Sequence, residues 1–249
     1  MNVLSKKSLK VYTLLIIILT ISAVISVYLP QGNIVDIQQE LPASKGVVAL
    51  VNALIMIVLY GGLGYIGLRL SLSLGLPGLW DKNVNIKQRF LLPAIYGIIA
   101  GILLIFFDYI FSFYNGIGKL VHPPFPTSFF ASLSAGIGEE IIFRLFFIPF
   151  WVWLISAVIL KGKYRKTVFW IVATFSAIAF AGAHLPSLMY LANVEKVINL
   201  SWILILEIFL LNSLISFPAA YYFKKYGILA AMGIHFWADI VWHLIYGLF

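Results

Sequence analysis

Three charged residues stand close together in a stretch of the chain that is otherwise apolar enough to cross a membrane: Glu139, Glu140 and Arg144. A charged side chain near the centre of a bilayer costs roughly 3 kcal/mol or more, so such residues usually pair or face a cavity. Glu140 and Arg144 are four residues apart, which places a carboxylate and a guanidinium on one face of a helix. Glu139 has no such partner and lies beside a like charge, which suits a general base.

Two more polar pairs fall in later apolar runs. Phe180 and His184 are four residues apart, as are His235 and Asp239, so each pair shares one face of a helix. In hydrocarbon each polar group needs a partner, and these groups could supply one another. Hydrolysis requires a base near a water and hydrogen-bond donors where negative charge develops. The alternative interpretation is an ion-pair network that only holds helices together.

The three motifs follow one another in a fixed order: Glu139-Glu140-x-x-x-Arg144, Phe180-x-x-x-His184 and His235-x-x-x-Asp239. This pattern, over roughly residues 127–243, resembles the CPBP family of intramembrane endopeptidases. That family includes CAAX proteases, bacteriocin-processing proteins and lysostaphin resistance protein A-like proteins. The resemblance implies peptide-bond hydrolysis within the membrane.

The resemblance also implies a role for each motif residue. Glu139 would activate a water that His184 helps to hold. His235 and Asp239 would face the carbonyl oxygen of the scissile bond and stabilise the oxyanion. The residues expected to support the site are Glu140, Arg144 and Phe180.

Position 239 departs from the family pattern, because many members have asparagine there and an ionised aspartate cannot donate a hydrogen bond. Asp239 could be protonated, could orient His235 or could ligate a metal. Glu139, His184, His235 and Asp239 are candidate zinc ligands, at most three at once because catalysis needs an open coordination position. The family is described both as metalloproteases and as metal-free glutamate proteases, so zinc remains a candidate cofactor.

The composition indicates which elements position these residues. The chain is 62% hydrophobic and only 10% charged, against roughly 25% charged residues in soluble domains. Apolar runs of about 20 residues predict an all-α, polytopic transmembrane bundle of about seven spans. The runs lie near 11–29, 47–68, 91–113, 127–160, 168–191, 200–222 and 228–248. A break at Pro149 would split the long fourth run and give eight spans. With these boundaries Glu139 and His184 lie at different depths and meet only if helices tilt or the boundaries shift.

Basic residues gather in alternate loops, which fixes the expected orientation. They are Lys6, Lys7, Lys10, Arg69, Lys82, Lys87, Arg89, Lys161, Lys163, Arg165, Lys166, Lys224 and Lys225. The positive-inside rule then places the N-terminus in the cytoplasm. We expect an integral, multi-pass protein of a prokaryotic plasma membrane, with lipid and a peptide or protein substrate as partners. Contact with anionic headgroups explains the net charge of +8 without nucleic acid.

We expect a single membrane domain over 1–249, with helices that carry no motif in 1–120 and a catalytic core in 127–243. The first hypothesis is an endopeptidase acting on a CAAX-type tail or a leader-bearing peptide. A proton-coupled transporter that uses the same carboxylates as a relay is a second. A catalytically silent bacteriocin-immunity or scaffold protein is a third. Outside the motifs, we expect Asp108 and Glu207 to form interhelical hydrogen bonds and His243 to be structural or interfacial.

Overall fold

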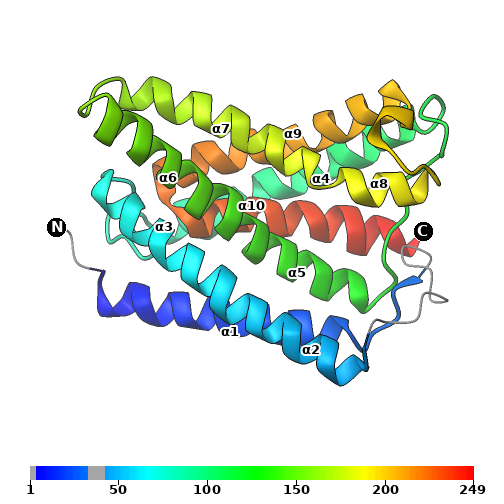
Figure 1. The fold of residues 1–249 in the computed structure, drawn as a ribbon, viewed down its shortest axis with the longest axis horizontal. Helices are drawn as coiled ribbons and strands as arrows, with labels where there is room; N and C mark the ends of the chain where they lie inside the picture. The colour runs from blue at the N-terminus through cyan, green and yellow to red at the C-terminus, as the bar shows by residue number, and fades with distance from the viewer. Residues whose placement is uncertain (1–3, 33–42) are drawn as a thin grey trace.

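The computed structural model describes residues 4–32 and 43–249. Across these residues the chain is helical and contains no strand, and seven helices are long and apolar enough to cross a membrane (Figure 1). This confirms the predicted fold class. The seven spans are Lys6–Ser26 (α1), Lys45–Ser73 (α2, Lys45–Leu54, to α3, Gly61–Ser73), Lys87–Phe111 (ending in α4, Leu92–Phe111), Thr127–Ile159, Arg165–Leu191 (α7, Arg165–Gly182, and α8, Leu185–Leu191), Trp202–Tyr226 (α9) and Ile228–Leu248 (beginning with α10, Ile228–Asp239).

The fourth span is one helix of 33 residues. α5 (Thr127–Glu139) continues through a π-helical segment, η4 (Glu140–Phe147), into α6 (Ile148–Val152) and on to Ile159. The chain does not break at Pro149, so the described residues contain no eighth span. Pro149 lies directly after the π-helical segment η4, and such a local change of hydrogen-bond pattern accommodates a residue without an amide hydrogen in a membrane helix.

The fifth span is interrupted, although its sequence predicts one run. α7 ends at Gly182, and His184 lies in the turn before α8. Measured from the turn that joins the fourth and fifth spans, Glu139 and His184 both lie roughly 30 Å along their helices, at 1.5 Å per residue. The two residues therefore reach the same depth, because the fourth helix continues unbroken past Pro149 and is longer than one crossing of a bilayer requires.

The seventh span lies at the centre of the bundle. In its most apolar window 67% of the residues are buried, against 6% in the second span. α10 packs against α4, α5 and α9, while α3 packs against η4. Glycines allow two of these approaches, since a Cβ at Gly67 would overlap the carbonyl oxygen of Leu145 and one at Gly97 would overlap that of Ile234. The residues with the three motifs are thus held in the most tightly packed part of the bundle.

Candidate active site

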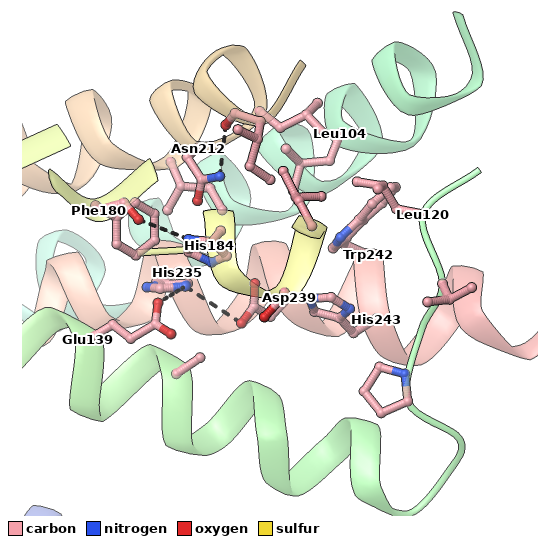
Figure 2. Close-up of a pocket in the computed structure, with 18 of the residues that line it drawn as sticks. Leu104, Leu120, Glu139, Phe180, His184, Asn212, His235, Asp239, Trp242 and His243 are labelled. Carbon is pink, nitrogen blue, oxygen red and sulfur yellow. Dashed lines mark hydrogen bonds and ion pairs between the residues drawn. The ribbon is translucent and has the colours of Figure 1, made fainter. Parts of the chain in front are cut away.

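A cavity of about 260 Å³ opens between α5, α8, α9 and α10, and four predicted catalytic residues line it. Figure 2 shows Glu139 reaching from α5 toward His235 and Asp239 on α10, with His184 on the opposite side. Apart from these groups the lining is largely apolar. The structure therefore brings together the ends of all three motifs, which the sequence separates by up to a hundred residues.

His235 is the centre of the site, and it is 3% exposed. Its Nδ1 lies 2.9 Å from Oε1 of Glu140. Because a carboxylate only accepts, Nδ1 carries the proton of this hydrogen bond. Its Nε2 faces the cavity, 3.7 Å from Oε2 of Glu139 and 3.6 Å from Oδ2 of Asp239. Glu140 thus sets which ring nitrogen meets a substrate.

The two adjacent glutamates occupy different environments. Successive helical residues point about 100° apart, so Glu139 is 34% exposed on the cavity side whereas Glu140 is fully buried. Nη1 of Arg144 lies 3.1 Å from Oε1 of Glu140, which is the ion pair that their spacing predicts. Arg144 also donates from Nη2 to Oγ of Ser216 on α9 at 2.8 Å. The buried pair ties η4 to α9 and supports the His235 ring.

Phe180 packs against three of these side chains. Its ring centre lies 5.1 Å from that of His184 and 5.5 Å from that of His235, both edge-on. The guanidinium carbon of Arg144 lies 4.4 Å from the same ring centre, a cation–π distance. The carbonyl oxygen of Phe180 also accepts from Nδ1 of His184 at 2.9 Å. This contact leaves Nε2 as the nitrogen of His184 that can meet a water.

The arrangement does not fit the zinc site that the sequence left open. Among the described residues, no group of three or more histidine, cysteine, aspartate or glutamate side chains could hold a metal ion. Both site histidines use Nδ1 within the protein, His184 on a backbone carbonyl and His235 on Glu140, so each has only Nε2 left for a ligand. The chemistry considered below therefore uses these side chains as acids, bases and donors.

Residues 121–241 match the family model described as type II CAAX prenyl endopeptidase Rce1-like. The chain carries an Rce1-like domain. The match includes all three motifs and confirms the resemblance to the CPBP family, which supports a CAAX-type membrane protease. No curated protein and no solved structure matches the chain.

Residues that belong to none of the three motifs also line the cavity. Asn212 on α9 lines the cavity and donates from Nδ2 to the carbonyl oxygen of Ile208 at 2.8 Å, which leaves its Oδ1 as an acceptor. His243, one turn beyond Asp239, lines it too. Its Nδ1 lies 3.1 Å from Nδ1 of His122, in the segment before α5. Burial lowers the pKa of His122 to about 4, so this histidine is neutral at physiological pH.

Asp108 and Glu207 do not line the cavity of the candidate active site, and both form hydrogen bonds to the loop between α4 and α5. Both side chains are fully buried. Oδ1 of Asp108 accepts from the amide of Leu120 at 3.0 Å, and Oε2 of Glu207 accepts from Nδ2 of Asn115 at 2.8 Å. Besides these contacts to a loop, a side-chain hydrogen bond joins Asp108 on α4 to Glu207 on α9, which is the interhelical contact that we expected. The hydrogen bonds to the loop attach it to the bundle, and Leu120 of that loop forms part of the cavity wall.

Proposed function

We propose that this protein is an intramembrane endopeptidase that hydrolyses a peptide bond with a water activated by Glu139. The observation that carries the proposal is the cavity, where Glu139, His184, His235 and Asp239 converge from three membrane spans. Ionisable groups in hydrocarbon are costly unless they pair or act. The Rce1-like domain supplies the class of reaction.

In the proposed reaction a water lies between Glu139 and His184. Glu139 takes a proton from the water while the water oxygen attacks the carbonyl carbon of the substrate. Negative charge develops on the carbonyl oxygen, which faces the side chain of Asp239 and Nε2 of His235; Nε2 donates to this oxygen when the ring carries a proton on both nitrogens. When the tetrahedral intermediate collapses, the carbon–nitrogen bond breaks and Glu139 returns the proton to the leaving amine. Glu140 keeps His235 oriented throughout.

The proposed substrate is a membrane-associated peptide or protein, with either a CAAX-type tail or a leader segment. The apolar lining of the cavity suits a segment that enters from the lipid. The proposal includes a cytoplasmic N-terminus, which the distribution of lysine and arginine predicts, and the plasma membrane of a prokaryote as the location.

The test is cleavage by detergent-purified protein of a quenched fluorescent peptide library that includes a prenylated member. Mass spectrometry of the products identifies the bond that is cut. We expect cleavage at one bond, and we expect it to persist with a zinc chelator. Proton-gradient-driven flux in proteoliposomes without any cleavage would contradict the proposal and support the transporter. The third hypothesis, a catalytically silent family member, would be supported if the protein is inert in both assays. Its immunity or scaffolding phenotype should then survive loss of Glu139, His184 and His235.

Replacing Asp239 with asparagine should preserve most of the cleavage rate, because a carboxamide can donate to the oxyanion at any pH. The wild-type rate should fall as pH rises and Asp239 loses its donor proton, whereas Asp239→Asn should lack this fall. Asp239→Leu, of similar volume but with no donor, should lower kcat by about 10²–10³-fold. Profiles of kcat against pH for the three proteins check this. If Asp239→Asn is as slow as Asp239→Leu, Asp239 does not act as a donor.

A further inference from the structure

A second cavity, of about 410 Å³, lies at the other end of the bundle from the candidate active site. It is formed where α3 ends, α7 begins and α9 ends. In Figure 1 these three helix ends lie on the left, while α8 and the C-terminus lie on the right. No motif and no residue of the proposed reaction reaches this cavity.

Three cationic side chains line this second cavity: Arg165, Lys166 and Lys224. Among the described residues no carboxylate lines it, and none of the three forms an ion pair with a carboxylate. Gathering like charges without a counter-charge is unfavourable, and the cost grows where the surroundings are partly apolar. An anion in this cavity would therefore be stabilised by all three.

Contacts within the protein hold two of these cations in place. Arg165 donates from Nη1 to the carbonyl oxygen of Leu74 at 3.2 Å, which leaves its other N–H groups free to bind a ligand. Nζ of Lys224 lies 4.6 Å from the ring centre of Phe169 and 5.2 Å from that of Trp170. Cations restrained in this way lose less conformational freedom when they bind an anion.

The beginning of α7 adds a partial positive charge to the same place. α7 is 18 residues long, and its N-cap residue Tyr164 makes no side-chain hydrogen bond to the first turn. The first amide groups of a helix have no partner inside the helix, and they point outward with the positive end of the helix dipole. Three side chains and a helix terminus thus direct positive charge into one cavity.

The remaining wall of this second cavity is apolar. An apolar wall beside three cations suits a molecule that is anionic at one end and apolar at the other. The apolar lining includes Leu74, Leu76 and Phe169. Just before α7 the chain exposes Ile159 and Tyr164, which are 62% and 70% exposed. The ends of membrane-spanning helices lie at the level of the headgroups, where tyrosine and tryptophan are common. The distribution of lysine and arginine predicts that this end of the bundle faces the cytoplasm. Basic pockets between spans on the cytoplasmic side of a membrane suit lipid headgroups.

We propose that this cavity binds the phosphate group of an anionic phospholipid, with Arg165, Lys166 and Lys224 as its contacts and the acyl chains along the apolar wall. This site is independent of the proposed protease activity. It would hold the start of α7 to the ends of α3 and α9, whether or not the protein cleaves peptides.

The test is the binding of phosphatidylglycerol to the purified full chain, by native mass spectrometry and by the shift in Tm in detergent. We expect phosphatidylglycerol to bind and to raise Tm, phosphatidylcholine to do neither, and inorganic phosphate to raise Tm less than phosphatidylglycerol does. The variant Lys166→Gln/Lys224→Gln should bind phosphatidylglycerol roughly tenfold more weakly or worse. The matched control Lys82→Gln/Lys87→Gln removes one lysine from the loop after α3 and one from the start of the third span, and it should bind like the wild type.

Lys166 is exposed, so Lys166→Glu leaves the packing intact and should also weaken binding, whereas Lys87→Glu should not. If the control variants weaken phosphatidylglycerol binding as much as the variants at Lys166 and Lys224 do, the binding depends on diffuse surface charge and the proposal is wrong. Equal binding of phosphatidylglycerol and phosphatidylcholine would overturn it as well. If inorganic phosphate raises Tm as much as phosphatidylglycerol does, the cavity recognises phosphate alone, and the proposal of a lipid as its ligand is wrong.

Discussion

Replacing Glu139 with glutamine is expected to lower kcat for peptide cleavage by about 10²–10⁴-fold, the contribution typical of a general base. Glutamine keeps the size of the side chain but cannot take a proton from water. The change should cost little stability, because Glu139 is 34% exposed and its one ionic contact is His235, at 3.7 Å. Measurement of kcat and Tm on the same purified sample separates the two effects.

The matched control for this variant is Glu195→Gln, the same chemical change at an exposed position outside the cavity. It should cleave at the wild-type rate. If the Glu139→Gln protein retains full activity, Glu139 does not activate the water and the proposed mechanism is wrong. A variant that loses activity together with a large drop in Tm would assign Glu139 a structural role instead.

Replacing Arg144 with methionine is expected to lower the free energy of unfolding by about 3–5 kcal/mol, the usual cost of leaving a buried charge without its partner. Arg144 is 1% exposed and Glu140 is fully buried, so water cannot take the place of the guanidinium. The variant also loses the hydrogen bond to Ser216 and the contact with Phe180. Equilibrium unfolding in mixed micelles measures the change.

A second substitution tests the physical reason for this loss. In Arg144→Met/Glu140→Gln no buried charge remains unpaired, and the carboxamide oxygen that replaces the Glu140 carboxylate can still accept from Nδ1 of His235. The double variant should therefore be more stable than Arg144→Met alone. If the double variant is the less stable of the two, the ion pair does not explain the destabilisation. Wild-type stability in Arg144→Met would contradict the prediction outright.

The number of spans and their order could be predicted because hydropathy is a property of local sequence. All seven predicted runs correspond to helices, with ends that differ by up to five residues. The interruption at His184 and the unbroken course of the fourth helix past Pro149 were harder to predict. Gly182 and Pro186 flank the turn, but apolar residues continue on both sides. Hydropathy does not register such a turn.

Within the candidate site, the predictions that depended on helical spacing were the most accurate. The i,i+4 contacts Glu140–Arg144 and His235–Asp239 are both present, at 3.1 and 3.6 Å. The contact of His235 with Glu140 joins residues that are 95 positions apart. No local pattern indicates which of two adjacent glutamates faces a histidine on another helix. That choice depends on how α10 packs against η4.

The sequence by itself determined that this is an all-α membrane protein with three motifs of polar residues inside its spans, because both follow from residue type and from a spacing of four residues. Only the tertiary structure decided that the motifs share one cavity, that Asn212 and His243 line it, and that Arg165 and Lys224 gather around a second cavity. These relations depend on helices that are distant in sequence, and the glycines that allow their close approach set which faces meet.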